Sequence, residues 1–229
     1  MRPSTEVPPP SLLPDAELIE HGLLGRLFRE RGAVTFREAA EVIWRLPYGR
    51  NSNGSDYRLV LLEGRGTCST KHALLRDLAQ EQGLSVDLVL GFYLMSELNM
   101  PGTGPVLAAH GLTTILEAHC VLKHRGHSID LTMPPGSPRG TPKRFVSWEF
   151  ISAEQIPAYK TARHKLLLAE WASKLESRRL GLAEAWQIRE ACIAMLESGT
   201  PSAPHSAIFD PARKSKAPIT SSLMEDGVE

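Results

Sequence analysis

A strand, a short turn and a second strand over residues 117–132 constrain the fold of this chain more than any other feature. Both strand-like segments are rich in residues that favour β-structure, and Arg125-Gly126 separates them. A two-residue connection predicts an antiparallel hairpin in which His124 faces His127. The hairpin therefore determines which side chains share a face of the predicted sheet.

This register places His119 and Asp130 on the same face. Side chains alternate between the two faces along a strand, so His119 shares a face with Val121, which pairs with Asp130. His119 and Asp130 then become diagonal neighbours, within reach of longer side chains. The opposite face carries four residues that suit an apolar core: Cys120, Leu122, Ile129 and Leu131.

Cys68 lies where a glycine-containing turn meets a predicted helix. The turn is Gly64-Arg65-Gly66-Thr67, and the helix ends near Gly83. Unpaired N–H groups and a partial positive charge at a helix N-terminus favour the thiolate, the nucleophilic form of cysteine. The same N–H groups stabilise an oxyanion during acyl transfer. One turn further on, His72 is predicted to occupy an exposed position of the helix.

These three residue types together have a defined chemistry. An imidazole that accepts the proton of a thiol, and a carboxylate that orients the imidazole, make cysteine a nucleophile toward acyl groups. We therefore predict Cys68, His119 and Asp130 as catalytic residues.

Helical patterns at both ends of the chain enclose the strands. Apolar spacing predicts a helix over residues 15–31, and Thr35 with Glu38 forms a predicted capping box for the next helix. Residues 156–198 are helical in pattern, with a break near Gly181. Helices first, strands in the middle and helices last predict an α+β fold.

The chain divides into four predicted segments. Residues 1–14 and 199–229 are rich in proline and lack periodicity, which predicts disordered tails. Residues 15–155 form the predicted core, and residues 156–198 form a helical segment packed on it.

Composition excludes several classes of protein. The 26 basic and 26 acidic residues balance, which argues against a protein that binds nucleic acid through its phosphates. Three cysteines give no disulfide framework. The N-terminus lacks the apolar region of a signal peptide, and no apolar run is long enough to cross a bilayer. We expect a soluble cytoplasmic protein without membrane contacts, and nothing in the sequence specifies an oligomeric state.

The ordered motifs resemble the transglutaminase-like superfamily, which has a fold related to papain, and its bacterial-type members in particular. The segment GTCSTKHALLRDLAQEQGLSVDLVLGFY is similar to the family's cysteine helix and the strand that follows it, with Cys68, Gly83 and Gly91 at familiar spacing. EAHC is similar to the histidine strand, and IDLT is similar to the strand that carries the aspartate. The resemblance covers about residues 60–132. It implies a cysteine-bearing central helix packed on a small antiparallel sheet.

The sequence departs from the family pattern in two places. Val121 stands where many members have tryptophan, and the upstream side chain that completes the oxyanion site in some members has no clear counterpart. Trp44, Tyr48, Asn51 and Asn53 are candidates for that side chain. Asn51 is preferred as an oxyanion or substrate contact, because neighbouring asparagines in a polar loop favour hydrogen bonding. The alternative is that both asparagines shape the turn.

The resemblance implies an enzyme that acts on a peptide or protein amide through an acyl-enzyme, without metal or organic cofactor. Hydrolysis would make it a peptidase or amidase, and transfer to an amine would make it a protein-glutamine transferase. A non-catalytic transglutaminase-like interaction module is the alternative. A zinc-binding protein is a further alternative, with Cys120, His124 and His127 as ligands.

Overall fold

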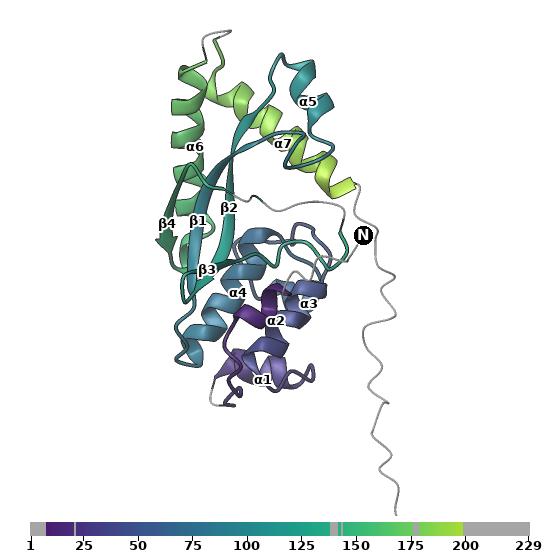
Figure 1. The fold of residues 1–229 in the computed structure, drawn as a ribbon, viewed down its shortest axis with the longest axis vertical. Helices are drawn as coiled ribbons and strands as arrows, with labels where there is room; N and C mark the ends of the chain where they lie inside the picture. The colour runs from purple at the N-terminus through teal and green to yellow at the C-terminus, as the bar shows by residue number, and fades with distance from the viewer. Residues whose placement is uncertain (1–7, 21, 138–141, 143, 176–178, 199–229) are drawn as a thin grey trace, which may run out of the picture.

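The computed structural model describes residues 8–20, 22–137, 142, 144–175 and 179–198. These residues form four strands and seven α-helices with two short 3-10 helices (Figure 1). In chain order the elements are η1 (Pro9–Leu12), α1 (Leu23–Arg29), α2 (Phe36–Arg45), α3 (Leu59–Glu63), α4 (Cys68–Glu81), β1 (Asp87–Met95), α5 (Gly104–Ala109), β2 (Ile115–His124), β3 (His127–Ile129), β4 (Ser147–Ile151), η2 (Ala153–Gln155), α6 (Ala158–Ser173) and α7 (Leu182–Ser198). The strands make one antiparallel sheet in the order β3-β2-β1-β4, which confirms the α+β prediction.

Helices surround the sheet in two groups. In Figure 1, α1, α2, α3 and α4 gather at one end of the molecule, α5 and α7 lie at the other, and α6 runs beside the sheet. The α6 and α7 helices pack against each other and against β2. The two groups therefore meet at β2, the strand that carries His119.

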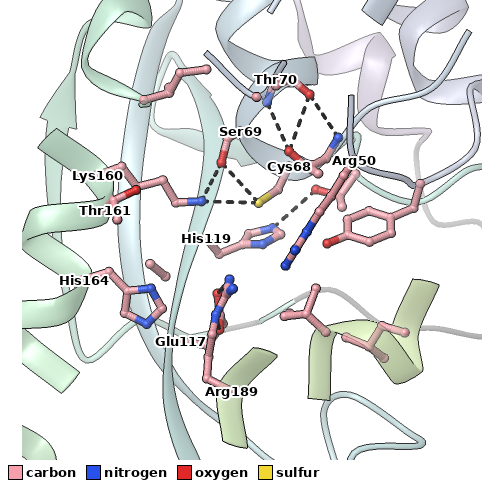
Figure 2. Close-up of a pocket in the computed structure, with 18 of the residues that line it drawn as sticks. Arg50, Cys68, Ser69, Thr70, Glu117, His119, Lys160, Thr161, His164 and Arg189 are labelled. Atoms are coloured by element: carbon pink, nitrogen blue, oxygen red, sulfur yellow. Dashed lines mark hydrogen bonds and ion pairs between the residues drawn. The ribbon is translucent and has the colours of Figure 1, made fainter. Parts of the chain in front are cut away.

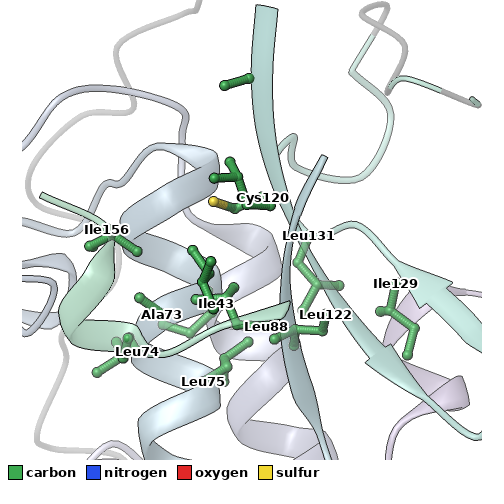
Figure 3. Close-up of a cluster of buried hydrophobic side chains, with 14 of the residues drawn as sticks. Ile43, Ala73, Leu74, Leu75, Leu88, Cys120, Leu122, Ile129, Leu131 and Ile156 are labelled. Carbon is green, nitrogen blue, oxygen red and sulfur yellow. The ribbon is translucent and has the colours of Figure 1, made fainter. Parts of the chain in front are cut away.

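The core lies between α4 and the sheet. One side of α4 is fully buried, and it faces apolar side chains of β1, β2 and the end of the hairpin (Figure 3). The buried residues of this interface include Ala73, Leu74, Leu75, Leu88, Cys120, Leu122, Ile129 and Leu131. The face predicted from hairpin register is thus the face that receives the cysteine helix.

The hairpin has the predicted register. His124 pairs with His127, and Leu122 pairs with Ile129. Arg125 and Gly126 both have positive φ angles, 46° and 83°. A two-residue turn with positive φ at both positions matches the right-handed twist of the flanking strands, which explains how Arg-Gly closes this hairpin.

The pairing between β2 and β3 ends before Asp130, although the register would allow it to continue. β3 ends at Ile129, so Asp130 leaves the ladder and β2 has no neighbour on that side at His119. The unpaired stretch of β2 lies against the N-terminus of α4, since Cys120 of β2 contacts Cys68 and Ser69. The short third strand thereby opens the space in which Cys68 meets His119.

Two predictions at the N-terminal end are wrong. Residues 8–14 are not a disordered tail, since they contain η1 and Leu13 is only 2% exposed. Residues 15–20 and 22 are not helical. The Leu18 N–H donates to the Val34 carbonyl and the Phe36 N–H donates to the Ala16 carbonyl, which pairs this segment with residues 34–36. The remaining parts of the predicted tails, residues 1–7 and 199–229, lie outside the described residues.

The other predicted helices are confirmed. Thr35 caps α2 and forms the capping box with Glu38. The C-terminal helical segment consists of α6 and α7, with Gly181 immediately before the second helix. These two helices supply side chains to the site described next.

Candidate active site

Cys68 is the first residue of α4 and lines a cavity of about 420 Å³. The helix begins there because Thr67 caps it: the Thr67 hydroxyl accepts a hydrogen bond from the N–H of Thr70, and the Thr70 hydroxyl accepts one from the N–H of Thr67. The Cys68 residue is 9% exposed. Its sulfur is therefore shielded from bulk water but open to the cavity (Figure 2).

His119 and Asp130 form the predicted pair. The Nε2 atom of His119 lies 2.6 Å from Oδ2 of Asp130, and the other carboxylate oxygen accepts the N–H of Thr132 at 2.9 Å. Burial by itself raises the pKa of Asp130, but the charge of His119 outweighs it and holds the pKa well below its usual range. Asp130 is thus ionised and fixes the imidazole ring, leaving the other ring nitrogen for Cys68.

The thiol and the imidazole have opposite charges at neutral pH. Burial raises the pKa of the Cys68 thiol, yet the charges of Lys160 and His119 outweigh burial and lower it from 9.0 to about 6. Burial lowers the pKa of His119, but Asp130 and Cys68 raise it from 6.5 to about 10. Between these values the site holds a thiolate beside an imidazolium, which is the reactive form of a cysteine nucleophile.

The unpaired edge of β2 also contributes to the site. The backbone N–H of Cys120 donates a hydrogen bond to the Cys68 sulfur, and this contact lowers the thiol pKa further. The Cys120 side chain points into the core, is fully buried and has a pKa raised to about 11 by burial. Cys120 therefore assists through its backbone while its own thiol stays protonated.

Buried polar residues of α4 attach the helix to the end of the hairpin. The Nδ1–H of His72 donates to the Cys68 carbonyl at 2.7 Å, and its Nε2 accepts the N–H of Leu131 at 2.8 Å. The Lys71 ammonium donates to the carbonyls of Leu46 and Thr132 at 2.6 and 2.8 Å. The predicted exposure of His72 is wrong, since it is 0% exposed. These bonds hold the two residues that follow Asp130, Leu131 and Thr132, against the cysteine helix.

Lys160 of α6 is a site residue that the sequence did not reveal. Its Nζ atom lies 4.0 Å from the Cys68 sulfur and donates a hydrogen bond to the hydroxyl of Ser69 (Figure 2). Lys160 follows Cys68 by 92 residues and belongs to no motif. Only the packing of α6 against β2 brings it to the thiol.

A buried ion pair forms another wall of the cavity. Glu117 of β2 and Arg189 of α7 make two hydrogen bonds, Nε to Oε2 at 2.6 Å and Nη2 to Oε1 at 2.7 Å. Arg50 lines the same cavity and pairs with Glu190 at 2.7 Å. Glu117 lies two residues before His119 on the same strand, so strand alternation could have placed it in the site.

The hydrogen bonds of Asn51 engage its amide within the protein, and its role as an oxyanion or substrate contact stays a prediction. Asn51 lines the cavity, but its amide nitrogen donates to Glu63 at 3.1 Å and to the Arg65 carbonyl at 2.9 Å. Its oxygen accepts the hydroxyl of Thr70 at 2.9 Å. The amide nitrogen therefore joins the polar loop to the end of α3 and to the turn before α4, and the amide oxygen joins it to α4. Tyr48 of the same group of candidates also lines the cavity.

The alternative zinc ligands do not come together. The Cys120 sulfur lies near Ser69, whereas the His124 ring bonds the Ser85 carbonyl at 2.7 Å and His127 is exposed at the turn. Within the part of the chain that the structure describes, no group of three or more histidine, cysteine or acidic residues is arranged for a metal ion.

Comparisons of the chain with protein-family models, curated proteins and solved structures gave no match. Across the described ranges, no helix is both long and apolar enough to span a bilayer.

Proposed function

We propose that this protein is a cysteine-dependent acyl-transfer enzyme with a transglutaminase-like core, acting on an amide bond of a peptide or protein. The observation that supports this most strongly is that Cys68 and His119 line one cavity while Asp130 holds the His119 ring. A nucleophile, a base within reach of it and a third group that orients the base are the signature of covalent acyl transfer.

The charges of the site suit the two halves of such a reaction. The Cys68 thiolate attacks the amide carbonyl and forms an S–C bond, while the carbonyl electron pair moves to oxygen. The His119 imidazolium then gives its proton to the amine nitrogen as the C–N bond breaks. The product is a thioester on Cys68 and a free amine. Asp130 keeps the imidazole in the required orientation throughout.

A second nucleophile must then resolve the thioester. Water gives a carboxylic acid, as in a peptidase or amidase, and an amine gives a new amide, as in a protein-glutamine transferase. The cavity of about 420 Å³ falls within the range of roughly 300–1,000 Å³ typical of small-ligand pockets. We favour hydrolysis because water needs no further binding site.

The pH dependence of thiol alkylation tests the ion pair on which this proposal rests. The rate of Cys68 modification by iodoacetamide is expected to rise with pH through about 6, because the thiol loses its proton there, and then to level off. Cys120 and Cys192 serve as internal controls, since burial raises the pKa of each to about 11. Peptide mapping of the alkylated protein gives the three rates separately.

The pH profile of amide turnover should fall again at high pH, whereas the pH profile of alkylation should not. His119 loses its proton near pH 10 and can then no longer protonate the leaving amine, so amide turnover should fall there. A Cys68 alkylation rate that rises only near pH 8 to 9, as for a free thiol, would contradict the proposed activation.

A further inference from the structure

Lys160 places a positive charge beside the nucleophile. Its Nζ atom is 4.0 Å from the Cys68 sulfur and hydrogen-bonded to Ser69. Throughout the described part of the chain, no carboxylate lies within ion-pair distance of this ammonium. The two arginines of the same cavity differ in this respect, because Arg189 pairs with Glu117 and Arg50 pairs with Glu190.

The groups around Lys160 keep it protonated. Burial lowers its pKa, but Cys68, Cys120 and Glu117 raise it and outweigh both burial and the repulsion of Arg189. Glu117 is held by Arg189, so it acts on Lys160 from a distance. The ammonium is therefore a fixed positive charge at the reacting sulfur, and Ser69 sets its position.

Acylation removes the negative charge that balances Lys160. When the thiolate adds to a carbonyl, the sulfur becomes neutral and the charge passes to the carbonyl oxygen. A buried ammonium without a counter-charge is costly, whereas the same ammonium near a developing oxyanion stabilises the transition state. Lys160 lines the cavity and its Nζ atom lies 4.0 Å from the sulfur, so its ammonium is within reach of the oxygen of the carbonyl that the sulfur attacks.

We propose that Lys160 is a catalytic residue that stabilises the negative charge of the reaction, first on the Cys68 sulfur and then on the carbonyl oxygen of the acyl donor. This inference rests on the proposed acyl-transfer function. The S–C bond forms as the carbonyl π bond opens, and Lys160 keeps its proton in both states. The oxygen charge returns to the carbonyl when the C–N bond breaks and His119 protonates the nitrogen.

Two reagents separate the two roles of Lys160. Iodoacetamide alkylates sulfur without forming an oxyanion, and p-nitrophenyl acetate acylates sulfur through one. Both rates are measured on the full chain at several pH values for the wild type, Lys160→Met and Lys160→Arg. Lys174→Met is the matched control. Lys174 caps the C-terminus of the same helix, α6, is exposed and pairs with Glu170. Circular dichroism and thermal unfolding verify that each variant is folded.

Lys160→Met is expected to raise the pH midpoint of alkylation, since the thiolate loses a neighbouring positive charge. At pH values where the thiol is fully ionised, its alkylation rate should approach that of the wild type, while acylation should remain about 10²–10³-fold slower. Lys160→Arg should recover part of both effects, and Lys174→Met should change neither. Ser69→Ala removes the hydroxyl that positions the Lys160 ammonium. It should also slow acylation, by a smaller factor than Lys160→Met.

The outcomes that contradict the inference differ from those that contradict the proposed function. If Lys160→Met slows alkylation and acylation equally once the thiol is ionised, Lys160 does not stabilise the oxyanion, and the acyl-transfer function stands. If Lys160→Met also leaves the pH midpoint of Cys68 alkylation unchanged, Lys160 does not stabilise the thiolate either. If wild-type Cys68 is alkylated rapidly but never acylated, the proposed function fails and the inference fails with it.

Discussion

Replacing His119 with alanine is expected to slow acyl transfer to Cys68 by roughly 10²–10⁴-fold, the usual contribution of a general acid–base group. The variant loses both the charge that keeps Cys68 ionised and the proton donor for the leaving amine. Asp130→Asn should also slow acyl transfer, by a smaller factor. The His119 imidazole would lose the carboxylate that orients it, whose Oδ2 atom lies 2.6 Å from Nε2. Single-turnover acylation and the pH profile of alkylation both report these changes.

His124→Ala is the matched control for this prediction. His124 belongs to the same strand but bonds the Ser85 carbonyl at the turn end of β2, away from Cys68. Its replacement should leave the acylation rate near that of the wild type. Equal rates for His119→Ala and His124→Ala would mean that the imidazole beside Cys68 has no part in the reaction.

Replacing Arg189 with methionine is expected to lower the free energy of unfolding by roughly 3–5 kcal/mol, the typical cost of breaking a buried ion pair. The Glu117 side chain is only 4% exposed and would keep its negative charge without a partner. For a domain of this size the loss corresponds to a decrease in Tm of roughly 6–20 °C. Thermal and denaturant unfolding measure it.

A double variant and an exposed pair complete this test. Arg189→Met combined with Glu117→Gln should recover part of the lost stability, because no uncompensated charge remains. Arg163→Met breaks an ion pair with Glu149 whose side chains are 36% and 30% exposed, so it should cost less than about 1 kcal/mol. Equal decreases in the free energy of unfolding for Arg163→Met and Arg189→Met would contradict the expectation that the buried ion pair costs more to break than the exposed one.

The sequence predicted the parts of the site that depend on local geometry. Strand alternation and a two-residue turn are enough to pair His119 with Asp130, because both rules operate within sixteen consecutive residues. The helix start at Cys68 was likewise visible from the turn before it. The α+β class followed from the order of helical and strand patterns alone.

The parts that the sequence missed depend on contacts between distant segments. Lys160 and Arg189 come from α6 and α7, and no pattern within those helices marks the residues that face β2. His72 was expected to be exposed because a polar residue on a helix usually is. It is buried instead, and its ring accepts a hydrogen bond from the N–H of Leu131. Asn51 was assigned from residue type, and the sequence did not reveal its hydrogen bonds to Glu63 and Thr70, which join the polar loop to α3 and α4.

The most direct test of the central claim is mass spectrometry of the intact protein after brief exposure to p-nitrophenyl acetate near neutral pH. A Cys68 thiolate activated by His119 predicts one acetyl group that maps to Cys68, with none on Cys120 or Cys192 over the same interval. The acetyl group should be absent from Cys68→Ala and strongly reduced in His119→Ala. Acetylation of Cys68 no faster than that of a free thiol, and unaffected by His119→Ala, would contradict the proposal that these residues form an acyl-transfer site.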